Sequence, residues 1–185
     1  MAGTALLVMD FQRSIVDRFD GSAALEAAVR AVGAAREAAV PVLFVRVAFR
    51  DGFPEIAASN RTFSAVRERG PSGTEQHEQA QIHPAFERRE REPLVTKRRV
   101  SAFTGSDLEV LLRCLGARHL VLAGIATSGV VLSTLRQAAD LDFGLTVLAD
   151  ACTDADPEAH RGLTETVFPR QATVTTVAGR SAGLP

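Results

Sequence analysis

Short uninterrupted runs of apolar residues recur along this chain, and longer segments of mixed polarity separate them. A run without polar alternation is typical of a strand that is covered on both faces, as in parallel sheets. Since the segments between the runs have helical character, we expect a three-layer α/β/α fold with a parallel sheet and right-handed crossovers. The predicted strands cover residues 5–9, 41–49, 94–97, 120–123, 145–148 and 172–177.

Between the strands, apolar side chains return at the three-to-four-residue spacing of a helix. Ser22 is expected to cap the first helix, and Ser106 with Glu109 has the spacing of a capping box. Gly116 would end that later helix. The predicted helices cover residues 22–39, 60–69 and 106–116, and two more begin near Gly129 and at Asp156 or Pro157.

Residues 50–91 form the least regular part of the chain. A long excursion from a compact domain usually forms a lid, a pocket wall or an oligomer contact. His77 and His83 lie within it without obvious carboxylate companions, so we expect His83, which precedes Pro84, to be structural. The charges of residues 87–92 alternate in sign and predict a solvated surface.

The composition excludes several classes of function. With 185 residues, 46% of them hydrophobic, the chain can form a full core, and we expect a single domain over residues 1–185. A formal net charge of −1 and the lack of Trp and Tyr argue against nucleic acid as a partner. No apolar run approaches membrane-spanning length, and residues 1–10 do not resemble a signal peptide. We therefore expect a cytoplasmic protein without a membrane partner.

The two cysteines, Cys114 and Cys152, do not suggest a disulfide framework, and no Cys or His cluster has zinc spacing. Cys114 lies in the apolar stripe of a predicted helix, which favours a small thiol buried in the core. Cys152 follows the strand at 145–148 and would face either the crevice at the strand ends or the core. We favour the core for both side chains.

Two ionisable residues stand where predicted strands end. Asp10 directly follows the first strand, and Lys97 ends the third. The carboxyl ends of parallel strands border the ligand crevice of an open α/β sheet, where low dielectric makes the protonation of a carboxylate adjustable. From spacing alone, Asp10 is equally well explained as a cap for the following turn, whereas a lysine after a strand is usually a surface charge.

The stretch from His119 to Thr134 has the pattern of a buried strand, a tight turn and a helix start. Gly124 would free the backbone for the turn, which is expected to end at Ser128. The beginning of a helix offers free N–H groups and the positive end of the helix dipole. This turn therefore favours an anionic group above the strand.

Three motifs in this sequence resemble those of the isochorismatase-like hydrolases, the superfamily of nicotinamidases, N-carbamoyl amidohydrolases and isochorismatases. Asp10 and Gln12 match its D-x-Q motif after the first strand, and Lys97 opens a K-x-x-x-S-A-F motif. The turn G-I-A-T-S-G-V-V matches the nucleophile turn, but Val130 stands where the amidases carry cysteine. The motifs extend to about His160 and so cover most of the chain.

The resemblance implies a Rossmann-like, six-stranded parallel sheet with the strand order 321456. It makes Asp10 the general acid/base and Lys97 its catalytic partner. No cofactor is implied, and no metal is expected because the D-x-H cluster of the nicotinamidase-like branch is missing from the sequence. The resemblance also implies an oxyanion-binding turn at Ile125, Ala126 and Val130 with a cis peptide between the first two, and substrate contacts from Gln12, Ser101, Phe103, Thr127 and Ser128.

Without a cysteine, the chain could act as isochorismatase does, which protonates a vinyl ether and lets water attack the oxocarbenium ion. That chemistry needs Asp10 and Lys97. Isochorismate is one candidate substrate only, because residues 126–128 differ from the tyrosine, alanine and histidine usual in isochorismatases.

The alternative is a catalytically silent member that binds a small molecule or a protein partner through the same cleft. Serine catalysis by Ser128 or Ser101 is a third hypothesis, which lacks a base within reach. The family also implies a homo-oligomer, a dimer or a tetramer.

Overall fold

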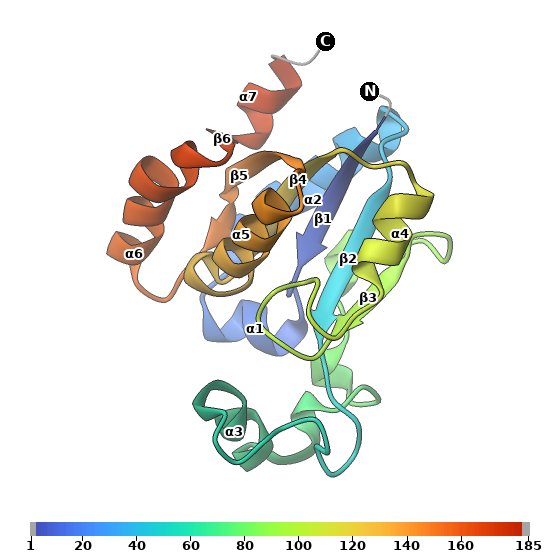
Figure 1. The fold of residues 1–185 in the computed structure, drawn as a ribbon, viewed down its shortest axis with the longest axis vertical. Helices are drawn as coiled ribbons and strands as arrows, with labels where there is room; N and C mark the ends of the chain where they lie inside the picture. The colour runs from blue at the N-terminus through green and yellow to red at the C-terminus, as the bar shows by residue number, and fades with distance from the viewer. Residues whose placement is uncertain (1–2, 183–185) are drawn as a thin grey trace.

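A computed structural model describes residues 3–182, which form a six-stranded sheet with every strand pair parallel. The strand order is β3-β2-β1-β4-β5-β6, which confirms the predicted order 321456. The central strands β1 and β4 are almost wholly buried because helices cover both faces of the sheet (Figure 1). The strands are β1 Thr4–Met9, β2 Val42–Val47, β3 Leu94–Lys97, β4 His119–Ile125, β5 Gly144–Thr153 and β6 Thr173–Thr175.

Two apolar clusters, one on each face, hold the helices to the sheet. Successive side chains of a strand point to opposite faces, so Leu6 and Val8 pack with α2 while Leu7 and Met9 pack with α4 and α5. This arrangement makes the three layers expected from the sequence. The helices are α1 Arg13–Arg18, α2 Ser22–Glu37, α3 Arg61–Glu68, α4 Leu108–Cys114, α5 Leu132–Asp140, α6 Pro157–Gly162 and α7 Val177–Ala182.

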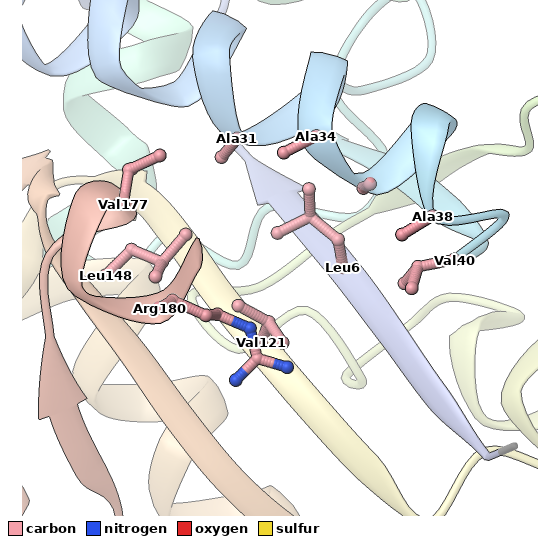
Figure 2. A pocket seen from close by; sticks show the side chains of 10 residues that line it. Leu6, Ala31, Ala34, Ala38, Val40, Val121, Leu148, Val177 and Arg180 are labelled. Carbon is pink, nitrogen blue, oxygen red and sulfur yellow. The ribbon is translucent and has the colours of Figure 1, made fainter. Parts of the chain in front are cut away.

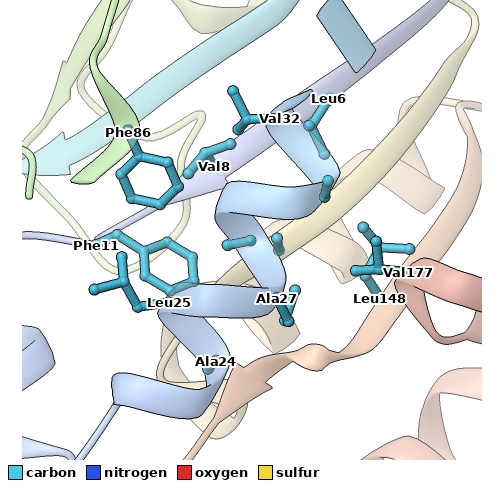
Figure 3. Close-up of a cluster of buried hydrophobic side chains, with 14 of the residues drawn as sticks. Leu6, Val8, Phe11, Ala24, Leu25, Ala27, Val32, Phe86, Leu148 and Val177 are labelled. Carbon is cyan, nitrogen blue, oxygen red and sulfur yellow. The ribbon is translucent and has the colours of Figure 1, made fainter. Parts of the chain in front are cut away.

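Helix α2 faces the sheet with mostly small side chains, among them Ala24 and Ala27, which let the helix lie close to β1 (Figure 3). Phe86, from the irregular excursion, packs edge-on against Phe11 and Phe44, with ring centroids 5.4 and 5.3 Å apart. Phe11 directly follows Asp10 in the sequence. The cluster therefore anchors the excursion to the segment that leaves β1.

The predicted capping box at Ser106 is wrong. Helix α4 begins at Leu108, and the side chain of its N-cap residue, Asp107, forms no capping bond. The Ser106 hydroxyl donates to the carbonyl of Ala102 and accepts from the N–H of Leu108, so it fixes the loop before the helix. Glu109 forms an ion pair with Arg113, one turn further along the helix.

The predicted cap at Ser22 is also wrong, and α1 was not predicted. Gly21 is the N-cap residue of α2, which makes Ser22 the first helical residue, and no side-chain capping bond forms there. The short helix α1 fills the space between β1 and Gly21. Gly116, with a φ of 63°, does follow the end of α4 as expected.

The two cysteines occupy different environments. Cys114 is exposed, which contradicts its predicted place in the core, because α4 turns Leu108 and Leu112 toward the sheet instead. Cys152 is buried within β5, which continues well beyond the predicted end at residue 148. The pairing of β4 with β5 shifts register, because Leu122 pairs with Val147 but Gly124 pairs with Cys152. The extra residues of β5 bulge between these two pairs.

Residues 50–91 contain α3 and three short turns of 3-10 helix; α3 lies beyond the carboxyl end of β2 (Figure 1). The last part of the excursion returns to the other end of the sheet, where Arg36 of α2 donates to the carbonyls of Phe86 and Glu87. A small apolar cluster at the start of this excursion includes Phe49 and Phe63. His77 and His83 each accept a hydrogen bond from a nearby backbone N–H, as expected of structural histidines. The middle of the excursion is folded onto the edge of the sheet that carries Asp10, because Ile82 forms a bridge with Gln12 and the N–H of His83 donates to the carbonyl of Phe11.

A separate small crevice of about 70 Å³ lies between α2 and α7 (Figure 2). Leu6 and Val121 line it near the amino ends of their strands, and Arg180 stands at its side. Asp10 and Lys97 lie at the opposite ends of their strands. Among the described residues, no helix has the length and apolar character needed to cross a membrane.

Candidate active site

Asp10 leaves β1 at the carboxyl edge of the sheet. Its N–H donates to the carbonyl of Val45 in β2 at 2.8 Å, and the residue is only 5% exposed. Its φ of 59° is uncommon for a residue with a side chain. Such conformations persist where the surrounding structure fixes them, and they concentrate at functional sites.

Lys97 comes from β3, two strands away from β1, and pairs in register with Val47 of the intervening β2. Its ammonium nitrogen lies 2.9 Å from Oδ2 of Asp10 and donates to the carbonyl of Arg99 at 3.0 Å. The Lys97 side chain is 2% exposed. The sheet therefore assembles a buried ion pair from two residues far apart in the sequence.

The electrostatic balance at Asp10 is unusual. Burial raises the pKa of the Asp10 carboxyl group, while the ammonium of Lys97 and the guanidinium of Arg18 act in the opposite direction. Oδ2 is paired with Lys97, and among the described residues Oδ1 is buried without a well-formed hydrogen bond, although the nearby backbone N–H of Val47 also lowers the pKa of the carboxyl group. A buried acceptor without a partner is costly, and a proton on Oδ1 would make it a donor instead. The group is thus suited to hold and release a proton at Oδ1.

The turn after β4 contains the cis peptide between Ile125 and Ala126 that the family resemblance implied. A wide helical turn over Thr127–Val131 follows and leads into α5. Gly124 does not have a positive φ, so backbone freedom is not the reason for glycine there. A Cβ at Gly124 would lie 3.1 Å from the carbonyl oxygen of Met9, so the glycine allows β1 and β4 to approach closely.

Val130 is 2% exposed and belongs to the apolar cluster that α4 and α5 form with the sheet. The N–H groups of Gly129 and Val131 both donate to the carbonyl of Ala126, at 3.1 and 3.3 Å. The N–H of Ser128 donates to Oδ2 of Asp154 at 2.7 Å. These three N–H groups hold the turn in shape, and Val130 adds packing without any reactive atom.

A histidine supports this turn from α6. Thr127 is fully buried, and its Oγ1 lies 2.8 Å from Nδ1 of His160. Ser128 is exposed beside it. The roles of Asp154 and His160 were not predicted, although both lie in the acidic segment after β5 where a site could have been suspected.

Other residues from the matched motifs have partners within the protein. The Gln12 amide donates to the carbonyl of Val47 at 3.0 Å and accepts from its N–H at 2.9 Å. The Ser101 hydroxyl donates to Oε1 of Gln137 on α5 at 2.6 Å. Phe103 is buried in the cluster that contains Val130. These contacts tie the motifs to β2 and α5, and thereby hold the surroundings of the ion pair in place.

A pocket of about 260 Å³ lies beside this edge of the sheet, where Gln12 and Val47 form part of its wall. Two arginines line it, Arg18 from α1 and Arg69 at the end of α3. Neither arginine stands out in the sequence, because each looks like an ordinary surface charge in its own segment. Within residues 3–182, no group of three or more His, Cys, Asp or Glu side chains is arranged to hold a metal ion.

Thiol labelling should separate the two cysteines. Iodoacetamide at pH 7.5 is expected to modify the exposed Cys114 and to leave Cys152 unmodified, because burial raises the pKa of Cys152 to about 12. Hydrolytic activity should survive, since neither thiol occupies position 130. Peptide mass spectrometry before and after unfolding in urea checks the sites. Loss of activity in proportion to alkylation of Cys152 would contradict this expectation.

Comparison with known proteins places these features in a family. The isochorismatase domain matches residues 4–179. YwoC, an uncharacterized isochorismatase family protein of Bacillus subtilis, is 32% identical over 167 residues, which cover 90% of this chain and 86% of YwoC. The ureidoacrylate amidohydrolase RutB of Stutzerimonas stutzeri is 33% identical over 177 residues, which cover 84% of this chain and 71% of that protein.

A solved structure gives the same result. An isochorismatase family protein from Burkholderia thailandensis superimposes with a TM-score of 0.84 at 28% sequence identity. The match covers 97% of this chain and 94% of the other chain. The likeness therefore extends over the sheet, both helical layers and the excursion.

Proposed function

This chain belongs to the isochorismatase family, and on that premise we propose that it hydrolyses a small molecule by general acid catalysis from Asp10, without a cysteine nucleophile. The observation that carries the proposal is the buried pair of Asp10 and Lys97, in which the ammonium holds one carboxyl oxygen and the other is buried without a well-formed hydrogen bond among the described residues. A general acid must keep its proton until the substrate takes it. Burial raises the pKa of Asp10 and so helps the carboxyl group to keep its proton until the substrate takes it.

The proposed reaction is the hydrolysis of an enol ether. Oδ1 of Asp10 gives its proton to the vinyl carbon, which produces an oxocarbenium ion on the substrate. Water adds to that ion and gives up a proton, which returns the Asp10 carboxylate to its acid form, and the resulting neutral hemiketal breaks down to a ketone and an alcohol. The carboxylate left on Asp10 is stabilised by the ammonium of Lys97 at 2.9 Å, so the proton donor becomes a paired anion as the cation forms.

Val130 supports this route over the amidase route of the family. Amide hydrolysis through a thioester needs a nucleophile at the turn, and a buried valine supplies none. The Ser101 hydroxyl donates to Gln137, and the backbone N–H of Ser128 donates to Asp154. Within residues 3–182, neither hydroxyl is hydrogen-bonded to a basic group. Protonation followed by attack of water needs no protein nucleophile.

The second candidate function is a silent family member that binds a ligand through the same cleft. The observation in its favour is again Val130, because loss of the nucleophile is what a former amidase would show. The two functions differ in one result. An enzyme forms product from an enol ether or an amide, and a binding protein forms none.

A panel of substrates tests the proposal. We expect product from isochorismate or a related enol ether, and none from amides such as N-carbamoyl compounds, because only the first class can react without position 130. Val130→Ala should keep the activity, since the proposed route uses no atom of that side chain. Product from amides alone would refute the acid mechanism, and no product from either class would favour the binding protein.

The pH profile of kcat should reflect the proton on Asp10. The reactive form is protonated, and burial raises the pKa of this group, so activity is present below that pKa and is lost as the pH rises through it. The expected profile therefore has a falling limb on the alkaline side. Steady-state rates in buffers of constant ionic strength check it. A profile that rises with pH would assign the carboxylate form, a general base, to catalysis.

A further inference from the structure

The segment that follows β3 decides where the Lys97 ammonium points. Among the described residues, that ammonium binds Oδ2 of Asp10 at 2.9 Å and the carbonyl of Arg99 at 3.0 Å. Residues 98–100 form a bend outside the helices and strands, and the N–H of Arg98 reaches the carbonyl of Thr104 only at 3.5 Å. The hydrogen bonds of the sheet therefore do not fix the Arg99 carbonyl, and side-chain contacts supply that support.

Arg98 gathers three segments of the chain around one guanidinium. It donates to the carbonyl of Ala48, directly after β2, and to Oε1 of Glu75, while its Nε lies 3.4 Å from Oε1 of Glu55. Glu55 precedes α3 and Glu75 follows it, so the two carboxylates come from both sides of that helix. The Arg98 side chain is only 16% exposed. A guanidinium offers five N–H donors in one plane, so it can bind several acceptors at once.

Arg99 adds a second attachment to the same part of the excursion. Its Nη2 donates to the carbonyl of Glu55 at 2.9 Å, and its guanidinium lies 6.0 Å from the centre of the Phe63 ring in α3. Its Nη1 donates to the carbonyl of Arg98 at 2.6 Å and closes the bend on itself. The carbonyl that receives the Lys97 ammonium thus belongs to a residue that the excursion holds from outside the sheet.

We propose that Arg98 is a positioning residue for the buried pair of Asp10 and Lys97. It fastens the bend after β3 to the end of β2 and to both sides of α3, and so keeps the Arg99 carbonyl where the ammonium can bind it and Asp10 together. Arg98 has Glu55 and Glu75 as its own ion-pair partners, so it acts on Asp10 through Lys97. This inference rests on the proposed function, in which the ammonium stabilises the carboxylate that proton donation leaves behind.

The titration of Asp10 tests this role without any turnover. Carbon-13 in the aspartate carboxyl groups reports their protonation by NMR, and the signal that Asp10→Asn removes belongs to Asp10. The ammonium of Lys97 lowers the pKa of this carboxyl group, as does the guanidinium of Arg18 on α1. Arg98→Gln should therefore move the titration midpoint of Asp10 to higher pH, because a displaced ammonium stabilises the carboxylate less.

Two further variants separate position from charge. Arg98→Lys keeps the positive charge, but an ammonium lacks the planar set of five donors, so the midpoint should still rise. The matched control is Arg50→Gln, which removes another cation from Glu55, one that is 66% exposed and 2.7 Å from Oε1. It should titrate as the wild type does. The proposal is overturned if Arg98→Gln leaves the midpoint unchanged, if Arg98→Lys restores the wild-type midpoint, or if Arg50→Gln gives the same rise.

Glu75→Gln covers the case in which the loss of Arg98 unfolds the protein. It weakens the same contact from the other side, at a side chain that is 30% exposed. Removal of a negative charge would by itself lower the pKa of a nearby carboxyl group, whereas a displaced Lys97 raises it. A higher midpoint for Asp10 therefore supports the positioning role, and a lower or unchanged midpoint contradicts it.

The kinetic consequences keep this inference apart from the proposed function. Arg98→Gln should lower kcat by about tenfold to a hundredfold and move the falling limb of the pH profile to higher pH. KM should stay close to that of the wild type, because Arg98 does not line the pocket beside Gln12. A midpoint that moves in a protein without turnover would keep the role of Arg98 and remove the enzyme. Turnover that depends on Asp10 but not on Arg98 would keep the enzyme and remove that role.

Discussion

Replacing Asp10 by asparagine is expected to lower kcat by about a hundredfold to ten-thousandfold, which is the usual contribution of a positioned general acid. The amide keeps the shape of the side chain but cannot donate an acidic proton to a vinyl carbon. Ligand binding should stay within about tenfold of wild type, since binding and transition-state stabilisation are separable. Steady-state kinetics with an enol ether, together with direct binding measurements, check both parts.

The control for this experiment is Asp17→Asn. It makes the same chemical change at an exposed position on α1, outside the ion pair. Its kcat should equal that of the wild type. A circular dichroism melt of Asp10→Asn would show that the variant is folded. Equal rates in wild type and Asp10→Asn would remove Asp10 from the mechanism.

Replacing Lys97 by methionine is expected to cost about 3–5 kcal/mol of unfolding free energy at pH 8, because it leaves the Asp10 charge buried without a partner. Turnover should also fall, since the carboxylate formed by proton donation loses its stabilising cation. Urea unfolding at several pH values measures the first effect. The double variant Asp10→Asn/Lys97→Met should recover most of the lost stability, because no charge is then left unpaired.

The loss of unfolding free energy in Lys97→Met should change with pH in one direction. Burial raises the pKa of Asp10 in the folded protein, and removing Lys97 raises it further because the opposing cation is gone. A carboxyl group with a raised folded-state pKa is stabilised relative to the unfolded chain at low pH, and this contribution disappears as the pH rises through the folded pKa. The deficit of Lys97→Met should therefore be small in acid and grow toward alkaline pH. A constant deficit would locate its cause in packing rather than in the charge of Asp10.

The sheet could be predicted because its signal is local. Runs such as Ala5–Met9 and Leu120–Ala123 are uninterrupted by polar residues, and their short length favours a strand covered on both faces over a buried helix. Helix starts were less certain, because a serine can bond to several nearby backbone groups. Ser106 bonds to Ala102 in the preceding loop, a contact that depends on how the chain returns from β3. Such choices are made by tertiary structure and are not visible in spacing.

The candidate site was predictable only in part, because tertiary structure also decides which residues meet there. Asp10 and Lys97 each follow a buried strand, and family resemblance joined them, but their 2.9 Å separation follows from the strand order. Arg18 and Arg69 belong to a short helix and to the irregular excursion. Nothing in the sequence relates them to each other. A pocket whose wall comes from several segments becomes visible only when those segments are placed in space.

The most direct test of the account follows the proton itself. An enol ether substrate is hydrolysed in D₂O, and NMR locates deuterium in the ketone product as it forms. The account predicts that wild-type protein delivers one deuterium to the former vinyl carbon, at a rate that Asp10→Asn does not reach. Formation of that product at the same rate by both proteins, or no hydrolysis of any enol ether by the wild type, would contradict it.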